Sequence, residues 1–319
     1  MIQKRLLLVG GEGFIGSYLA AKFMAQGFKV AVMDNYSNST PNEQNYAQGM
    51  KVYPNDICYK TEVDMVFNDF LPHYVFHLAA QTNAPGSFRN PTDDAWTNIL
   101  GTIHIIEASH LYGIQHLIYS SSGGAVYGET NPWGADELST PFPATPYGLS
   151  KLASEAYFPM LLRNSSTRYD ILRYSNVYGP GQGERGEGGV ISIFANRLEL
   201  GLPLKVYGKD TNADRGCIRD YVYVDDIYQA HRLLLETPVH ETRVLNVSSG
   251  DDLPTLDLAQ RMGKVWGTEP IIYMDPPRKG DVGTSIITNG LIHKVLPGYI
   301  ATPLDLGLKL YRDSRFTTK

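Results

Sequence analysis

The 319-residue sequence contains only two cysteines, Cys58 and Cys217, which lie far apart and outside any C-x-x-C pattern. This scarcity argues against a disulfide scaffold and favours a reducing compartment, so we expect a cytoplasmic protein. The sequence also lacks any apolar run approaching 18 residues, the length that a membrane-spanning helix needs, so no membrane partner is expected. The apolar run at residues 6–9 ends in glycines, which is too short for the hydrophobic region of a signal peptide.

Charge is modest: 19% of residues are charged and the formal net charge is −5, with a pI near 5.9. This balance argues against nucleic acid or an anionic membrane as the main partner. A hydrophobic content of 43% indicates a globular protein with a sizeable core, and the length favours about two domains. No second metal-binding residue type stands at ligand spacing from His77, so we interpret it as a core histidine and expect no metal.

Glycine is plentiful, and three glycines stand between a predicted strand and a predicted helix. The strand is residues 6–9, the helix is residues 17–26, and Gly10, Gly13 and Gly16 form G-x-x-G-x-x-G between them. Such glycines allow a tight turn, close approach of the backbone to a pyrophosphate, and tight packing of helix on strand. The helix N-terminus then offers N–H donors to an anion. The pattern predicts a dinucleotide-binding turn.

A second apolar strand, residues 29–33, ends at Asp34, which lies 18 residues past Gly16. A carboxylate at this distance can accept hydrogen bonds from the ribose hydroxyls of adenosine, and it would repel a 2′-phosphate. Asn35 and Tyr36 follow, not an arginine, so the sequence favours NAD over NADP. The alternative is that Asp34 is a plain turn residue.

Further apolar strands are predicted at residues 74–78, 115–120 and 169–174, with a long helix at 93–111. The alternation of strand and helix predicts an α/β fold of the Rossmann type with a doubly wound parallel sheet. Ligands in such sheets bind beyond the carboxyl ends of the strands. Small residues at 79–80 would permit close packing against a flat cofactor, or would simply fit a crowded sheet edge. Asp56 could meet the adenine amino group, or could be an ordinary loop carboxylate.

Tyr147 and Lys151 are four residues apart, so on a helix they share one face. Pro146 suits the first turn of that helix. An ammonium held near a phenol favours the phenolate and lowers the pKa of the tyrosine towards neutrality, which makes Tyr147 a candidate general acid or base. A bare Y-x-x-x-K also occurs in ordinary amphipathic helices, so the remaining motifs must decide.

Together these motifs resemble the extended short-chain dehydrogenases/reductases, in particular the NAD-dependent nucleotide-sugar epimerases and dehydratases, and most closely the UDP-hexose 4-epimerases. The resemblance rests on residues 10–16, 34–35, 56–57, 77–81, 120–128, 147–151, 173–179, 219–225 and 278–281. It covers nearly the whole chain. It implies NAD as cofactor, a nucleotide sugar as substrate, and a homodimer built on helices near 93–111 and 146–164.

The resemblance also implies the roles of single residues. Tyr147 would be the acid/base, Lys151 would hold the nicotinamide ribose and polarise Tyr147, and Ser122 would orient the sugar hydroxyl. The implied cofactor residues are Gly10, Gly13, Phe14, Ile15, Gly16, Asp34, Asn35, Asp56, Ile57, Leu78, Ala79, Ala80, Gln81, Asn98, Ser120, Tyr147, Lys151 and Tyr174. The implied substrate residues are Ser121, Ser122, Gly123, Asn176, Val190, Arg219, Arg278 and Asp281. Taken alone, each arginine could equally form a surface salt bridge.

The chain departs from the family pattern in three places. Val9 stands where a threonine is usual. One residue more than in the commonest epimerase pattern separates Ser122 from Val126 and Tyr127, so Ser121 could take the hydroxyl role instead. Residues 282–292 match poorly, which leaves the nucleoside open.

The second half of the chain predicts a smaller α/β substrate-binding domain. Residues 179–189 are too rich in glycine for regular structure, and a loop over the substrate and a plain connection both remain open. Helices are predicted at 190–201, 225–236, 255–266 and 303–312, and strands at 204–207 and 221–224. We therefore expect an NAD-binding domain over residues 1–177 and a sugar-nucleotide domain over 178–319, with the chain recrossing between them within 205–250.

The leading hypothesis is NAD-dependent epimerisation at C4 of a nucleotide-diphosphate hexose of the UDP-glucose/UDP-galactose type, through a transient 4-keto sugar. A first alternative is an NAD(P)H-dependent reductase of a nucleotide-linked 4-keto-6-deoxy sugar. A 4,6-dehydratase is less favoured because Gly123 and Gly124 cannot transfer protons. A non-catalytic dinucleotide sensor would be expected to have lost the catalytic residues, which are present here.

Overall fold

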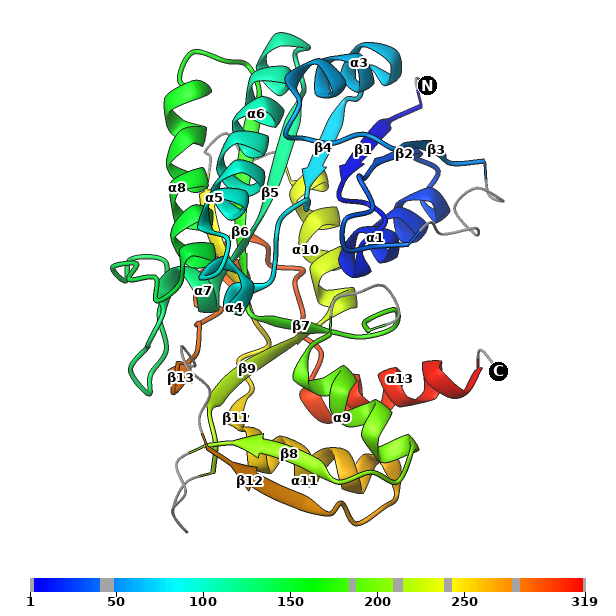
Figure 1. Cartoon of the computed structure of the whole chain (residues 1–319). Helices are drawn as coiled ribbons and strands as arrows, with labels where there is room; N and C mark the ends of the chain where they lie inside the picture. Colours follow the sequence, from blue (N-terminus) through cyan, green and yellow to red (C-terminus); the bar gives the residue numbers. More distant parts are fainter. Residues whose placement is uncertain are drawn as a thin grey trace.

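Seven strands pair side by side into one sheet in the computed structural model, which describes residues 3–40, 49–183, 188–208, 215–237, 243–276 and 282–317 (Figure 1). Across the sheet they are β10 (Arg243–Val247), β6 (Arg168–Tyr174), β5 (His116–Ser122), β4 (Tyr74–His77), β1 (Arg5–Val9), β2 (Lys29–Met33) and β3 (Lys51–Tyr53). Every neighbouring pair is parallel. The run from β3 to β6 follows the order typical of Rossmann folds, with the reversal between β1 and β4. The predicted fold class is confirmed.

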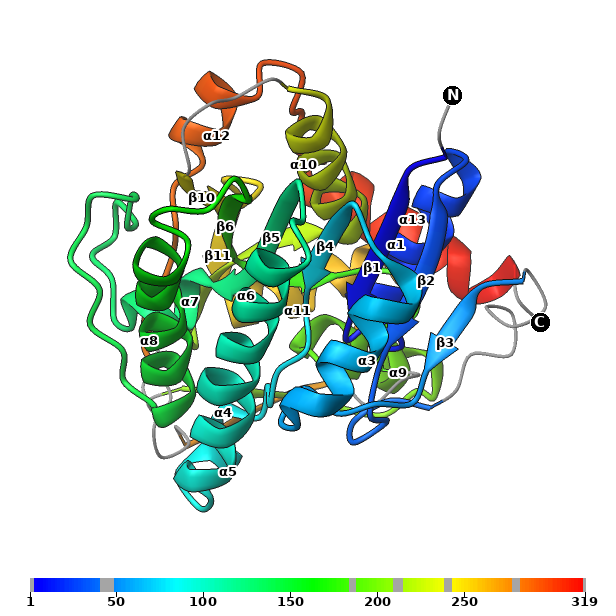
Figure 2. The same cartoon turned by 90° about the horizontal axis from the view of Figure 1, so that it is seen from above.

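Helices cover both faces of this sheet, because successive strand residues point to opposite sides. Leu6 and Leu8 pack towards α1 (Phe14–Ala25), α10 (Val224–Glu236) and α12 (Gly290–Val295). Leu7 and Val9 pack towards α3 (Lys60–Phe70), α6 (Gly101–Leu111) and α8 (Pro146–Leu161). Figure 2 shows these two groups of helices on opposite sides of the sheet. All four side chains are fully buried, which explains the continuous apolar run in the sequence.

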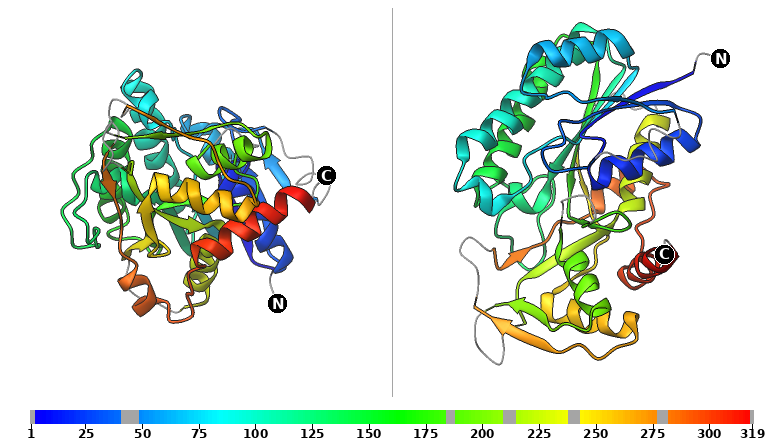
Figure 3. Two further views of the ribbon diagram at one scale, coloured as in Figure 1. Left: turned by 90° about the horizontal axis from the view of Figure 1, so that it is seen from below. Right: turned by 45° about the vertical axis from the view of Figure 1, so that its right-hand side comes forward.

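The smaller lobe is built on a second sheet below the first (Figure 1). It contains β7 (Asn176–Tyr178), β9 (Ile218–Tyr223), β11 (Asp252–Pro254) and β13 (Thr284–Ser285), and a separate pair is formed by β8 (Leu204–Tyr207) and β12 (Ile272–Asp275). Its core is closed by α9 (Val190–Glu199), α11 (Thr255–Trp266) and α13 (Leu304–Thr317), the last two lying side by side in Figure 3. Between β9 and β11 the chain returns to the large sheet through α10 and β10.

Several boundaries differ from the sequence-based expectation. Helix α1 begins at Phe14, directly after Gly13 and three residues earlier than predicted. Strand β5 continues to Ser122 because its last two residues pair with Arg173 and Tyr174 of β6, and a short helix that was not predicted, α7 (Gly123–Tyr127), follows it. In the described part of the chain, no helix is long and apolar enough to cross a membrane.

The long helix predicted at 93–111 has a more complex form. It consists of α5 (Pro91–Ala95), a π-helical turn η1 (Trp96–Leu100) and α6. Asn98 lies in the π turn. Such turns re-aim a side chain within an otherwise regular helix and are frequent at functional sites, and no spacing pattern in the sequence predicted this one.

We expect Gly10→Ala to destabilise the protein more than Gly27→Ala does. Both glycines have positive φ, +80° and +84°, so each alanine incurs about 1–2 kcal/mol of backbone strain. At Gly10 the new Cβ would also lie 2.4 Å from the backbone nitrogen of Ala79, whereas at Gly27 it would meet nothing within 4 Å. Urea unfolding of the two variants measures the difference, and equal losses would contradict the close approach.

Candidate active site

The glycine-rich turn lies at the carboxyl end of β1, between β2 and β4. Gly10 closes the turn with positive φ, and a Cβ on Gly16 would lie 2.4 Å from the carbonyl oxygen of Gly10. Gly13 is the residue before α1, so the first N–H groups of this helix have no partner within it and face outward. Phe14 is buried and Ile15 packs against the core, so of these two predicted cofactor residues only the backbone can serve a ligand.

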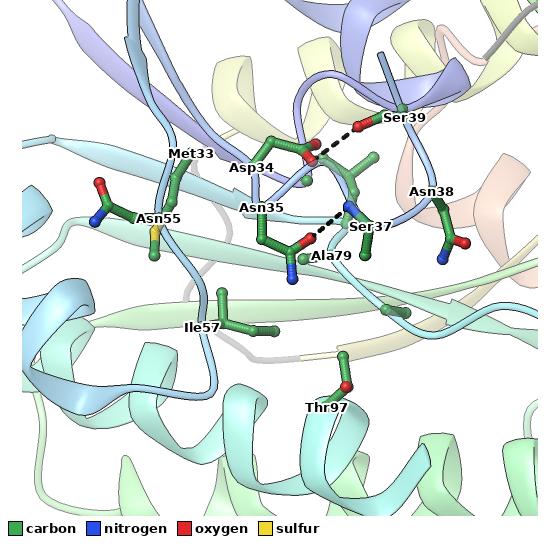
Figure 4. A pocket seen from close by; sticks show the side chains of 14 residues that line it. Met33, Asp34, Asn35, Ser37, Asn38, Ser39, Asn55, Ile57, Ala79 and Thr97 are labelled. Carbon is green, nitrogen blue, oxygen red and sulfur yellow. Dashed lines mark hydrogen bonds between the residues drawn. The ribbon is translucent and has the colours of Figure 1, made fainter. Parts of the chain in front are cut away.

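Asp34 is fixed at the edge of a cleft that follows this turn. Its carboxylate accepts hydrogen bonds from the backbone N–H of Glu12 (3.0 Å), the backbone N–H of Tyr36 (2.9 Å) and Oγ of Ser39 (2.9 Å). Figure 4 shows Asp34 beside Ser39, with Asn35 and Ser37 next to them. A carboxylate that is held by three donors cannot swing away, so the Asp34 side chain is fixed at the edge of this cleft.

Asp56 does not line this cleft itself but holds Asn35, which does. It accepts hydrogen bonds from Nδ2 of Asn35 (2.9 Å) and from the backbone N–H of Cys58 (2.8 Å). Burial acts to raise the pKa of Asp56, but these hydrogen bonds outweigh it and lower the pKa below its usual value. The carboxylate therefore stays ionised and orients Asn35.

Eight of the predicted cofactor residues line the cleft together. They are Gly10, Gly13, Asp34, Asn35, Ile57, Leu78, Ala79 and Ala80. Sequence reasoning missed other lining residues, which are Met33, Ser37, Asn38, Ser39, Asn55 and Thr97. The polar run directly after Asp34, at a strand's carboxyl end, was the available signal for three of them. The cleft combines a backbone cradle, a helix N-terminus and a fixed carboxylate, which together fit a dinucleotide without a 2′-phosphate.

Asn98 does not line this cleft, and its side chain is 1% exposed. Its Oδ1 accepts from the backbone N–H of Gln81 (2.8 Å), and its Nδ2 donates to the carbonyl of Gln81 (3.1 Å) and to Oγ of Ser150 (3.1 Å). The π turn thus ties the segment after β4 to helix α8. The predicted residues Gln81 and Asn98 are brought together, as a bridge within the protein.

Tyr147 and Ser122 line a second cavity, beyond the carboxyl ends of β5 and β6. Helix α8 begins at Pro146 as predicted, with Thr145 Oγ1 accepting from the backbone N–H of Gly148 (3.0 Å). The cavity is lined by Ala84, Ser122, Gly124, Ala125, Gly128, Ala144, Thr145, Tyr147, Tyr174, Ser175, Asn176, Arg219, Val282 and Ser285. Four predicted site residues besides Tyr147 therefore meet here from β5, β6, β7 and β9.

Lys151 lies one turn after Tyr147 and is buried, with 3% of its surface exposed. Its ammonium donates to the carbonyl of Ser120 (2.6 Å) and stands 4.3 Å from the ring centre of Tyr119. Burial lowers the pKa of Lys151 to about 7, although the carboxylates of Glu155 and Asp94 act in the opposite direction. The lysine thus titrates near neutrality.

The two candidate serines point to opposite sides of β5. Ser121 Oγ is buried and donates to Oε1 of Glu155 at 2.6 Å, whereas Ser122 lines the cavity with Tyr147. This alternation follows from strand geometry. Ser120, on the same side as Ser122, has its Oγ 3.0 Å from Oη of Tyr174. The geometry therefore favours Ser122 over Ser121 as the hydroxyl at the cavity.

A third cavity extends into the smaller lobe and shares Asn176 and Arg219 with the second. Its walls are Asn176, Gly188, Val190, Ile193, Phe194, Arg197, Lys205, Tyr207, Cys217, Arg219, Tyr221 and Thr255. Arg219 is oriented by donating to the carbonyls of Val282 (2.5 Å) and Gly283 (3.2 Å). Sequence reasoning missed Lys205 and Tyr207, although both lie in a predicted strand. Gly123 stands between Ser122 and Gly124, which line the second cavity, but it is itself buried, and a Cβ there would meet Ile287. Arg278 and Asp281 lie outside the described residues.

A Rossmann sheet with a fixed carboxylate after β2, a helix carrying Tyr147 and Lys151, and a basic cavity in the second lobe are together typical of a dinucleotide-binding enzyme. Residues 6–248 match the NAD dependent epimerase/dehydratase family. The chain belongs to this family, and its cofactor is NAD.

Known proteins of this family are similar along most of the chain. A putative UDP-glucose 4-epimerase of Methanocaldococcus jannaschii is 36% identical over 277 residues, 87% of each chain. A dTDP-4-dehydro-6-deoxyglucose reductase of Escherichia coli is 28% identical over 85% of each chain.

Solved structures agree with this assignment. The UDP-glucose 4-epimerase of Thermotoga maritima, crystallised with UDP-glucose, is 36% identical with a TM-score of 0.88 and covers 98% of this chain and 99% of its own. The UDP-glucose 4-epimerase of Thermus thermophilus, in complex with NAD, is also 36% identical, with a TM-score of 0.87 and coverage of 97% and 98%.

We expect Lys151→Met to stabilise the cofactor-free protein at pH 7. The pKa of Lys151 is about 7 when folded and about 10.5 when unfolded, so the unfolded chain binds the extra proton between these values. The loss of folding stability caused by burying the Lys151 ammonium is therefore complete below pH 7, and it disappears as the pH rises towards 10.5. Its upper bound is about 5 kcal/mol.

Urea unfolding between pH 6 and pH 10 measures this effect, with Lys264→Met as the control because that side chain is exposed on α11. The gain in Lys151→Met should shrink as the pH rises, while Lys264→Met should differ from the parent by a constant amount. A gain that is independent of pH would show that the lysine is not buried as described.

Proposed function

We propose that this protein interconverts the C4 epimers of a nucleotide-diphosphate hexose of the UDP-glucose/UDP-galactose type, through a transient 4-keto sugar. One observation carries the proposal. Tyr147 and Ser122 line the second cavity, which opens at the same edge of the sheet as the cleft at Asp34, and Arg219 joins this cavity to the basic third cavity. A nucleotide sugar could then place its hexose in the second cavity and its diphosphate in the third cavity.

The chain's own residues would manage one proton. Tyr147, as phenolate, takes the proton of the sugar 4-hydroxyl and later returns it, and Ser122 donates a hydrogen bond that orients the same oxygen. Lys151, when charged, favours the phenolate form. Bound NAD supplies the reversible hydride chemistry, and residues 10–16, Asp34 and Asp56 would hold it.

The small residues around the reacting position support turnover of a planar sugar within the cavity. Ala84, Gly124, Ala125 and Ala144 form part of its wall. Gly123 and Gly124 stand where a dehydratase would need a further acid and base, and they cannot transfer protons. This favours epimerisation over 4,6-dehydration.

The substrate residues from the sequence remain part of the proposal. Arg219 and Lys205 suit a diphosphate, since guanidinium and ammonium groups both pair with phosphate oxygens. Arg278 and Asp281 are proposed to contact the substrate through their family resemblance alone. The division into a cofactor domain (1–177) and a substrate domain (178–319) is likewise proposed.

A homodimer is proposed on the helices near 93–111 and 146–164, as the family resemblance implies. Trp96, Leu149 and Met160 lie on these helices and are 52%, 58% and 74% exposed. Large exposed apolar side chains on neighbouring helices are typical of an interface.

A second candidate function is reduction of a nucleotide-linked 4-keto-6-deoxy sugar. The similarity to the Escherichia coli dTDP-4-dehydro-6-deoxyglucose reductase favours it. The two functions differ in cofactor balance, because an epimerase regenerates its NAD each turnover, whereas a reductase consumes NADH or NADPH. Oxidation of added NADH by a 4-keto sugar nucleotide, without interconversion of hexoses, would support the reductase.

The purified protein should interconvert UDP-glucose and UDP-galactose without added cofactor. We expect Tyr147→Phe to lower kcat by about 10²–10⁴-fold, because it removes the group that moves the proton. Tyr157→Phe, on the same helix and partly buried in the core, is the matched control and should keep near-parental activity. Product analysis by chromatography measures both, and an active Tyr147→Phe variant would overturn the assignment.

Asp34→Asn should weaken the preference for NAD over NADP. The amide keeps the shape of the side chain but removes the charge that repels a 2′-phosphate, so we expect the ratio of affinities to fall by about tenfold, or about 1.4 kcal/mol. Asp56→Asn serves as control and should leave the ratio unchanged. Calorimetric titration of each variant with both cofactors decides, and an unchanged ratio in Asp34→Asn would exclude the ribose role.

A further inference from the structure

A buried polar cluster lies behind the cavity, on the side of β5 that faces α8. Glu155 of α8 forms a forked ion pair with Arg173 of β6, with Nη2 at 2.6 Å and Nε at 3.0 Å from its oxygens. Ser121 donates to the same carboxylate, and Arg173 Nη1 donates to Oη of Tyr127 (2.7 Å). Tyr127 in turn donates to Oδ1 of Asn246 (3.1 Å). These five residues, the Glu155 cluster, are 0–6% exposed.

The cluster is aligned with the reacting residues by the register of the sheet. Ser121, Arg173 and Asn246 pair side by side across β5, β6 and β10. The neighbours of Ser121 in the chain are Ser120, whose carbonyl accepts from Lys151, and Ser122, which lines the cavity. A shift of Ser121 therefore moves both contacts at once.

The cluster also lies one helical turn from the buried cation. Glu155 follows Lys151 by four residues on α8, so both project from one face of the helix. The other titratable groups that interact with Lys151 are Asp94 of α5, His77 of β4 and Tyr119 of β5, and Tyr147 precedes it by one turn of α8. Burial lowers the pKa of His77 to about 3, so this histidine stays neutral. Glu155 and Asp94 are the negative groups that favour the charged form of Lys151 and oppose the lowering of its pKa by burial.

We propose that Glu155 is a positioning residue of the catalytic helix: clamped by Arg173, it fixes the end of β5 through Ser121 and holds the charge on Lys151. This role rests on the function proposed above. Buried ion pairs generally contribute little net stability compared with apolar residues of the same size. A role in stability alone therefore does not explain why the Glu155–Arg173 ion pair lies level with Ser121 and Asn246, next to the residues that contact Lys151 and the cavity.

Three variants separate the two parts of this role. Glu155→Gln removes the negative charge and leaves Arg173 uncompensated, and both changes disfavour the charged form of Lys151. Ser121→Ala removes one hydrogen bond and no charge. Asp170→Asn is the matched control, because Asp170 is fully buried on β6, the strand of Arg173, and pairs with Arg168 and His116 at the opposite end of the strand.

The readout for charge is NMR titration of the cofactor-free protein with ¹³C-labelled lysine, in which the Lys151 signal is assigned by its loss in Lys151→Met. We expect Glu155→Gln to lower the pKa of Lys151 by about one unit, and Ser121→Ala and Asp170→Asn to leave it unchanged. The readout for position is kcat for hexose interconversion. It should fall about tenfold or more in Glu155→Gln and several-fold in Ser121→Ala, at constant KM, and recover in part in Glu155→Asp.

An unchanged Lys151 titration in Glu155→Gln overturns the charge part, and unchanged kcat in Ser121→Ala overturns the positioning part. If Glu155→Gln fails to fold, the paired variant Glu155→Gln/Arg173→Met, which leaves neither partner of the ion pair uncompensated, carries the lysine titration, and Ser121→Ala carries the kcat measurement. A parent protein that interconverts no hexose refutes the proposed function, but the lysine titration still decides whether Glu155 controls the charge of Lys151.

Discussion

The arrangement of this protein depends on one buried cation. Lys151 is placed under the carboxyl edge of the sheet, with its ammonium on the carbonyl of Ser120 and over the ring of Tyr119. Burying an ammonium is costly, and the cost appears directly as the lowered pKa of Lys151. The neighbouring elements keep this group in place. Glu155 and Asp94 supply negative charge. At the start of α8, Thr145 and Ser87 accept hydrogen bonds from the first backbone N–H groups.

The parallel sheet brings residues from distant parts of the chain to the same edge. Asp34 follows β2, Ala79 follows β4, Ser122 ends β5 and Tyr174 ends β6, so the cleft at Asp34 and the cavity at Tyr147 lie at the same edge of the sheet. The second lobe adds Arg219 and Lys205 from strands that leave the large sheet. The chemistry proposed for Tyr147 needs all three parts, because a phenol without a neighbouring cofactor or a held sugar has nothing to deprotonate.

Two polar networks connect the site to the fold. Asn98, in its π turn, joins the segment after β4 to Ser150 of α8. The Glu155 cluster joins the same helix to β5, β6 and β10. Helix α8 is thus hydrogen-bonded at several points along its buried face. Such connected and satisfied networks rigidify a core, which suits the proton and hydride transfers proposed for this site.

Much of this protein was determined by local sequence. The apolar runs, the spacing of Gly10, Gly13 and Gly16, and the four-residue interval from Tyr147 to Lys151 predicted the fold, the cofactor and the start of α8, because each follows from the geometry of a few neighbouring residues. The tertiary structure alone decided which serine faces the cavity, why Asn98 is buried, and that Glu155 pairs with Arg173. These depend on strand register, a π turn and contacts between residues far apart in the chain, and no local pattern encodes such long-range pairings.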